Sequence, residues 1–167
     1  MSDFDLHGSH LPILIRAIQK TSGHRPVLEL GMGWSSTPTL HWMCADLGRK
    51  LVSCESDPKW LQNFIDYQSD NHTIKLVENW QVQGFEKTHW SVVLIDQRPA
   101  LQRHRDAINL AHSADIVILH DTQPETDRFY AYRRVWEHYK YRYDYTKFLP
   151  HTTAVSNYID VAKELSI

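Results

Sequence analysis

The sequence predicts an α/β protein built on a parallel sheet. Short apolar runs alternate with longer segments of helical periodicity, which is the pattern of repeated β-α-β units. Five apolar runs, namely VLEL, KLVSC, HTIKLVE, WSVVLID and ADIVILHD, end at or just before glycine, polar or acidic residues. Because ligands of open parallel sheets bind where the strands end, these end residues are candidates for a functional site.

The first part of the chain is organised as successive β-α-β units. Its expected elements are a helix over 11–21, a strand over 27–30, a helix over 36–47, a strand over 50–54, a helix over 57–68 and a strand over 72–78. Ser36, Thr37 and Pro38 supply helix-start chemistry for the second helix. Asp57 followed by Pro58 does the same for the third helix.

The second part continues this alternation and then changes character. We expect a strand over 91–95, a helix over 101–112, a strand over 114–121, an aromatic helix over 126–141, and strands within 143–149 and 152–158. Pro150 and His151 separate the last two strands, which form a terminal antiparallel hairpin in this interpretation.

Composition narrows the functional classes. The 167 residues fit one domain, 1–167, and a formal charge of -2 gives no bulk attraction to nucleic acid or to a membrane surface. Cys44 and Cys54 lie in apolar segments without the CxxC spacing of a redox or metal site. The start of the chain shows no signal-peptide pattern. We therefore expect a cytoplasmic monomer or homodimer whose partner is a small molecule.

The most informative stretch is Val27–Thr37, VLELGMGWSST. Glycines directly after a buried strand let the backbone approach a ligand, and the helix that follows presents unpaired N–H groups. A dinucleotide-binding turn would read G-x-G-x-x-G, but Ser36 stands at the third glycine position. The stretch resembles motif I of class I S-adenosylmethionine-dependent methyltransferases, E/D-x-G-x-G. Its Ser-Thr pair is similar to that of small-molecule O-methyltransferases.

This resemblance extends from Val27 through the terminal hairpin and implies roles for the turn residues. Gly31 and Gly33 would pass under the methionine part of the cofactor, and Glu29 would support the loop or bind the ammonium group. The hydroxyls from Ser35 to Thr37, with Ser36 between them, would bind the cofactor carboxylate. The alternative is a structural turn without a ligand.

Two further strand ends would complete the cofactor site. Glu55 stands about twenty residues after the turn, a spacing at which a carboxylate can accept hydrogen bonds from a ribose diol. Its alternative role is to cap the helix that begins at Asp57-Pro58. Glu78, Asn79 and Trp80 would lie near an adenine, although Trp80 is equally suited to core packing.

The ends of the fourth and fifth strands carry the catalytic candidates Asp96, His120 and Asp121. The two acids resemble the magnesium site of catechol-type and macrolide-sugar O-methyltransferases, in which the ion activates substrate hydroxyls. Thr122 departs from that pattern, because the family usually supplies a stronger oxygen ligand there. Two acids at adjacent strand ends repel each other unless a ligand, a proton or a cation separates them.

A metal-free reaction would use His120 as the general base. The alternative is that His120 ends a strand and bonds a neighbouring loop. Residues 1–10 are expected to form a tail or a lid, in which Ser9 or His10 touches the cofactor. His7 and His10 are a poor metal site by themselves. The aromatic and basic segment 127–145 is expected to pack on the sheet rather than bind nucleic acid.

The resemblance implies a Rossmann-like, doubly wound sheet of seven strands in the order 3-2-1-4-5-7-6, with the last strand antiparallel. It also implies methyl transfer from S-adenosylmethionine to an oxygen or nitrogen of a small molecule. Two alternatives stay open. One is a non-catalytic module that binds S-adenosylmethionine or S-adenosylhomocysteine. The other is an NAD- or nucleotide-linked α/β enzyme, against which the missing third glycine argues.

Overall fold

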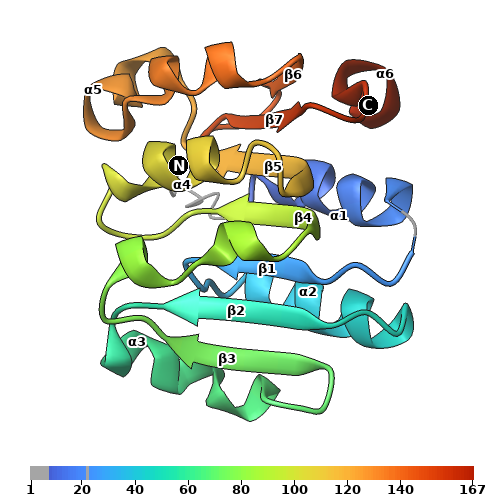
Figure 1. Cartoon of the computed structure of the whole chain (residues 1–167), viewed down its shortest axis with the longest axis vertical. Coiled ribbons are helices and arrows are strands. Elements are labelled where there is room, and N and C mark those ends of the chain that lie inside the picture. The colour runs from blue at the N-terminus through green and yellow to red at the C-terminus, as the bar shows by residue number, and fades with distance from the viewer. Residues whose placement is uncertain (1–7, 22) are drawn as a thin grey trace, which may run out of the picture.

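The computed structural model describes residues 8–21 and 23–167, which form a seven-stranded sheet in the order β3-β2-β1-β4-β5-β7-β6 (Figure 1). The strands are β1 Val27–Leu30, β2 Leu51–Glu55, β3 His72–Leu76, β4 Trp90–Ile95, β5 Ala114–His120, β6 Tyr141–Tyr145 and β7 Thr152–Ser156. Strands β1 to β5 are parallel, whereas β7 is antiparallel to both β5 and β6. The predicted strand order and the antiparallel last strand are confirmed.

Helices cover both faces of the sheet, as a doubly wound fold requires (Figure 1). The helices are α1 Leu11–Lys20, α2 Ser36–Asp46, α3 Pro58–Leu61, α4 Gln102–Asn109, α5 Asp127–Tyr130 and α6 Val161–Leu165. The buried apolar residues of α1, α2 and α6 pack in one core cluster, and Ala107 of α4 packs in the other. The short helix α6 was not expected from the sequence.

Alternate side chains of each central strand enter opposite cores. Leu28 of β1 and Val93 of β4 belong to the core under α4, whereas Val27 and Val92 belong to the core under α1 and α2. All six residues of β4 are buried, because helices cover the sheet on both sides. This double burial is why the strands appear in the sequence as continuous apolar runs.

The predicted aromatic helix over 126–141 is wrong. Helix α5 has four residues and ends at Ala131, whose φ of +54° is left-handed, and two 3-10 turns follow at Tyr132–Arg134 and Trp136–His138. The Tyr132 hydroxyl donates to the His120 carbonyl oxygen and the Tyr139 hydroxyl donates to the Ala107 carbonyl oxygen. We attribute the break to these anchors, which tie the segment to the sheet and to α4 at separate points.

Two other expectations need smaller corrections. The helix expected over 57–68 is α-helical only in α3 and continues as a 3-10 helix over Gln62–Tyr67. Strand β6 begins at Tyr141, two residues before the expected hairpin. Within the part of the chain that the structure describes, no helix combines the length and the apolar character needed to cross a bilayer.

Candidate functional site

The glycine turn after β1 contains two glycines with different structural requirements. Gly31 has a φ of +89°, and a Cβ there would lie 2.5 Å from the backbone nitrogen of Gln97. Only glycine fits at this position. A Cβ on Gly33 would meet the Ser36 hydroxyl oxygen at 3.4 Å and no other group of the described chain. The fold therefore tolerates a side chain at position 33, whereas a ligand lying against the turn would not.

Glu29 supports the turn from inside the protein. It is completely buried, and the Thr37 hydroxyl lies 3.0 Å from each of its carboxylate oxygens. The same hydroxyl oxygen accepts a hydrogen bond from the Gly33 backbone N–H at 3.0 Å. Burial raises the pKa of Glu29 to about 7, against the lowering effect of hydrogen bonds from Ser36, Ser53 and Thr37. Thr37 thus connects a buried carboxyl group to the glycine turn.

The three hydroxyl residues at the start of α2 differ in exposure. Ser36 and Thr37 are buried, with exposed fractions of 3% and 0%, and both serve Glu29. Ser35 is only partly buried, and its side chain makes no capping hydrogen bond to α2. Of the three hydroxyls predicted to bind the cofactor carboxylate, Ser35 is therefore the most accessible to a ligand.

Glu55, at the end of β2, contacts the glycine turn directly. Its Oε1 accepts from the backbone N–H groups of Ser56 at 2.6 Å and Asp57 at 2.9 Å, and its Oε2 accepts from the Met32 N–H at 3.3 Å. Helix α3 is capped by Asp57, which accepts from the N–H groups of Lys59 and Trp60. Glu55 is thus not the side-chain cap of α3. Among the described residues, its Oε2 accepts this one long bond, which leaves capacity to accept from a ligand.

Trp34 and Trp60 form an aromatic surface beside the turn that sequence reasoning did not assign. Trp34 is 60% exposed, and its ring centroid lies 4.8 Å from that of Phe64. The indole N–H of Trp60 donates to the Met32 carbonyl oxygen at 2.8 Å. The sequence did contain a signal for this surface. Trp34 directly follows the second glycine of the motif, at a position where a small residue would be enough to form the turn.

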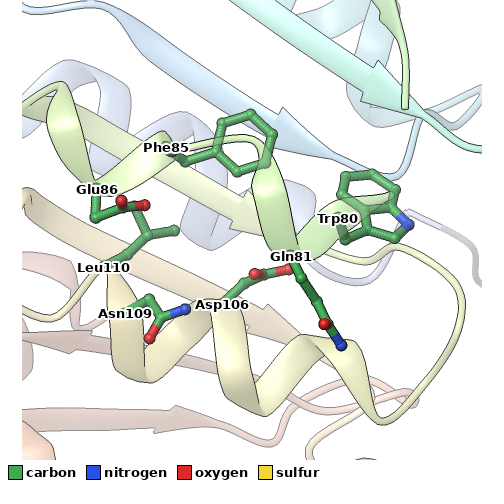
Figure 2. A pocket seen from close by; sticks show the side chains of 8 residues that line it. Trp80, Gln81, Phe85, Glu86, Asp106, Asn109 and Leu110 are labelled. Carbon is green, nitrogen blue, oxygen red and sulfur yellow. The ribbon is translucent and has the colours of Figure 1, made fainter. Parts of the chain in front are cut away.

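The residues after β3 lie in a different environment. Glu78 and Asn79 are exposed, and the Asn79 side chain accepts from the Gln81 N–H at 2.9 Å. Trp80 is 6% exposed and packs in the core under α4. It also lines a small pocket between the β3–β4 connection and α4, with Phe85 on its own side and Asp106 on α4 (Figure 2). This placement favours core packing for Trp80.

The predicted catalytic residues Asp96, His120 and Asp121 lie together and are joined by Arg103. One terminal nitrogen of Arg103 lies 2.8 Å from Asp96 Oδ1, and the other donates to Asp121 Oδ2 at 2.9 Å. Tyr130 also donates to Asp121 Oδ2, at 3.0 Å. The cation that two neighbouring acids require is therefore an arginine of α4 whose side chain is 6% exposed.

Sequence reasoning missed Arg103, although α4 offered a signal. Its sequence is QRHRDAIN, which provides few apolar residues for the face that packs on the sheet. Gln102, Arg103, His104 and Asp106 are all buried. A helix that covers a sheet with polar residues indicates a buried polar network.

His120 connects the acids to the N-terminal segment. Its Nδ1 lies 3.2 Å from Asp96 Oδ2, and its Nε2 lies 3.0 Å from the Ser9 hydroxyl oxygen. Ser9 has a single hydroxyl proton and donates it to the Pro150 carbonyl oxygen at 2.7 Å. The His120 Nε2 therefore donates to Ser9 while Nδ1 donates to Asp96, which is the arrangement of an imidazolium.

The pKa directions agree with this arrangement. Burial alone would lower the pKa of His120, but the hydrogen bond and charge of Asp96 raise it above its ordinary value. Burial would raise the pKa of Asp96, but the hydrogen bond from His120 and the charge of Arg103 hold it below its usual range. The neighbouring His10 makes no hydrogen bond to an acid among the described residues. Burial, reinforced by His120, lowers its pKa to about 4, although the charges of Asp96 and Asp121 act to raise it.

Residues 8–10 lie at the edge where the parallel strands end, close to Ser35 on one side and to His120 on the other. A Cβ on Gly8 would lie 3.2 Å from the Ser35 hydroxyl, Ser9 bonds His120, and the His10 ring centroid lies 4.7 Å from that of His120. Residues 8–10 thus lie close to Ser35 and His120, while the rest of the expected tail or lid, residues 1–7 with His7, lies outside the described residues.

The predicted magnesium ligands Asp96 and Asp121 do not fit that ion well. Arg103 already supplies the positive charge between them, and the Thr122 hydroxyl is hydrogen-bonded to the Thr153 hydroxyl at 2.9 Å. Magnesium demands an octahedral set of hard oxygen ligands, which this pair does not provide. The two acids are therefore better explained as partners of Arg103 than as magnesium ligands.

No known protein family matches the sequence, and no curated protein is similar to it at a significant level. Solved structures are similar in fold. The N-terminal domain of human METTL16, in complex with SAH, is 11% identical with a TM-score of 0.59, over 90% of this chain and 68% of that chain. The precorrin-6y C5,15-methyltransferase of Geobacter metallireducens is 11% identical with a TM-score of 0.58, over 88% and 89%.

A third similar structure is the fibrillarin pre-rRNA processing protein of Methanococcus jannaschii, which is 16% identical. Its TM-score is 0.56, over 87% of this chain and 75% of that chain. At these identities the likeness concerns the fold alone. Strand order, strand directions and structural neighbours together show that the chain has the Rossmann-like fold of class I methyltransferases.

Proposed function

We propose that this protein is an S-adenosylmethionine-dependent methyltransferase that acts on an oxygen or nitrogen of a small molecule. The observation that carries the proposal is the placement of two polar groups on opposite sides of the Gly31–Gly33 turn. Glu55 lies on the β2 side, and Asp96 with its partners lies on the β4 side. The strand order reverses between β1 and β4, and open α/β sheets bind their ligands at that point.

The β2 side has the chemistry for the cofactor. Gly33 is open to a ligand, and the N-terminus of the eleven-residue α2 favours a carboxylate. In this proposal Ser35 binds that carboxylate and Glu55 Oε2 accepts from the ribose. Trp34 offers the exposed aromatic face that the sequence pattern suggested for Trp80.

The β4–β5 side has the chemistry for the acceptor. Methyl transfer breaks the bond from the methyl carbon to sulfur and forms a bond to the acceptor, which loses a proton, while S-adenosylhomocysteine leaves. The enzyme must position the two molecules and take up that proton. We assign the proton to the Asp96 carboxylate, because both ring nitrogens of His120 already donate, and we assign orientation of the acceptor to Asp121, held by Arg103 and Tyr130.

A small acceptor fits the formal charge of -2 better than a nucleic acid does. RNA is the second candidate, because Arg128, Arg133 and Arg134 are exposed on the segment after β5 and one structural neighbour is a pre-rRNA processing protein. Buried aromatics of that segment, such as Tyr132 and Tyr139, pack in the core and do not offer a stacking surface. The proposal keeps a cytoplasmic setting, since both cysteines are free and buried.

The first test is calorimetric titration of the purified chain with S-adenosylmethionine, S-adenosylhomocysteine and NAD. We expect the first two to bind and NAD not to bind. Gly33→Ala should weaken S-adenosylhomocysteine binding by more than about tenfold, or 1.4 kcal/mol, with little change in the melting temperature. Glu86→Gln, at an exposed acid away from the turn, is the matched control. A folded protein that binds neither methyl cofactor would overturn the proposal.

The second test separates binding from transfer. Asp96→Asn and Asp121→Asn should keep the affinity for S-adenosylhomocysteine and lose turnover, measured as S-adenosylhomocysteine release with a panel of phenols, sugars and amines. Short RNAs form a separate arm, and methylation only in that arm would favour the RNA candidate. Cofactor binding without turnover in every arm would favour the non-catalytic module.

A further inference from the structure

His10 is the least explained polar side chain near the site. It is 2% exposed, and neither ring nitrogen has a hydrogen-bond partner among residues 8–21 and 23–167. A buried polar group without a partner destabilises the fold, so each such group in a native protein calls for a specific explanation. Its ring lies edge-on to that of His120, with 4.7 Å between the centroids.

We propose that His10, Asp96 and His120 form a binding site for a divalent transition-metal ion, with Zn²⁺ as the representative ion. One ligand atom from each of the three residues lies within 4.8 Å of the other two. Nitrogen and oxygen ligands bind Zn²⁺ at about 2.0–2.2 Å, which sets tetrahedral ligand atoms about 3.4 Å apart. His120 Nδ1 and Asp96 Oδ2 already have this spacing, at 3.2 Å. Binding of the ion requires the His10 ring to move so that its ligand nitrogen, now within 4.8 Å of the other two atoms, also reaches this spacing.

The surroundings orient both residues of that pair as metal ligands require. A metal-binding histidine usually donates its other ring N–H to a fixed acceptor. His120 Nε2 has such an acceptor in the Ser9 hydroxyl, which is itself fixed by its bond to the Pro150 carbonyl oxygen. Arg103 binds Asp96 Oδ1 at 2.8 Å and leaves Oδ2 for the ion, which takes the place of the His120 Nδ1 proton.

The donor set determines the class of ion. Two imidazole nitrogens and one carboxylate oxygen suit Zn²⁺, Fe²⁺ and similar ions, whereas Mg²⁺ and Ca²⁺ prefer oxygen ligands alone. Three protein ligands leave a coordination position for water or a substrate oxygen. The site differs from the predicted Asp96–Asp121 pair because it uses His10 from the N-terminal segment and does not use Asp121. It does not depend on methyl transfer.

The test uses the full, untagged chain, freed of metal with a chelator and titrated calorimetrically with ZnCl₂. We expect one ion per chain, a higher melting temperature with Zn²⁺, and no displacement by excess Mg²⁺. Titration with Co²⁺ should give visible absorption bands typical of nitrogen and oxygen ligands. Each readout is independent of catalysis and of S-adenosylmethionine binding.

Variants test the assignment of the ligands. His10→Ala and Asp96→Asn should weaken Zn²⁺ binding by more than about tenfold. His41→Ala is the matched control, because His41 and His72 form another close pair, 3.1 Å between their Nδ1 atoms. His10→Gln replaces the alanine variant if that variant does not fold. Absence of Zn²⁺ binding, unchanged binding in the His10 variants, or an equal loss in His41→Ala would overturn the proposal.

Discussion

The Thr37 hydroxyl lies 3.0 Å from both carboxylate oxygens of Glu29, a residue with no exposed surface. Burial raises the pKa of Glu29 from 4.5 to about 7. The folded protein therefore binds this proton more tightly than the unfolded chain does, and the carboxyl group stabilises the fold most when it is protonated.

The first prediction is a dependence of stability on pH. Between pH 4.5 and about 7 the native state holds more protons at Glu29 than the unfolded state, so the free energy of unfolding falls as pH rises. The loss is on the order of 3 kcal/mol. Glu29→Gln should remove this contribution. The free energy of unfolding of the variant, measured in urea, should therefore rise relative to that of the native protein between about pH 5 and pH 8. Parallel pH curves for the two proteins would contradict it.

The second prediction concerns Arg103. Arg103→Met leaves Asp96 and Asp121 without their cation, and breaking a buried pair in this way costs about 3–5 kcal/mol. Urea unfolding should show this loss. Asp121→Asn in the same chain should recover part of it, because one of the two acids is then neutral. Additive losses in the double variant would mean that the two side chains are not coupled.

The third prediction uses the left-handed backbone at Ala131, where φ is +54°. An L-residue in this conformation costs about 1–2 kcal/mol, and glycine avoids that cost. Ala131→Gly should therefore raise the free energy of unfolding by about 1 kcal/mol. Ala45→Gly, at an exposed position inside α2, is the control with the opposite sign and should lose about 1 kcal/mol. Destabilisation by both glycine substitutions would contradict the left-handed conformation of Ala131.

The fourth prediction concerns the contact between Ser9 and His120. Ser9→Ala leaves His120 Nε2 and the Pro150 carbonyl oxygen without this partner, at a cost of about 1–3 kcal/mol. Thermal unfolding should show the loss, and a protease that cleaves the N-terminal segment should cut the variant faster than the native chain. Ser56→Ala, at a surface hydroxyl, serves as the control. Equal cleavage of both variants would show that Ser9 does not hold the segment in place.

The sheet was predictable because its strands are buried on both faces. Such strands appear as apolar runs that end at polar residues, and this pattern located β1, β2, β4 and β5 to within one or two residues. The parallel topology brought Glu55, Asp96 and His120 to the same edge of the sheet, where β2, β4 and β5 end. The local sequence pattern was sufficient to place these strands and the residues at their ends, because burial and strand direction determine both.

The interior of the candidate site was not predictable in the same way. Arg103 joins two acids that precede and follow it in the chain, and the polar sequence of α4 indicates a buried network without identifying these partners. His10 reaches His120 across 110 residues. The break at Ala131 arises because tyrosine hydroxyls bond distant carbonyl groups, which outweighs the helical periodicity of the segment.

The close contact at Gly31 has a consequence for how this protein can diverge. A Cβ at that position would lie within 2.6 Å of the Asp96 carbonyl carbon and of the Gln97 backbone. The glycine turn after β1 and the loop after β4 are therefore in direct backbone contact. Any change that moves the acid-bearing loop also moves the turn beside it. A residue other than glycine at position 31 is therefore excluded for as long as the two loops keep this contact.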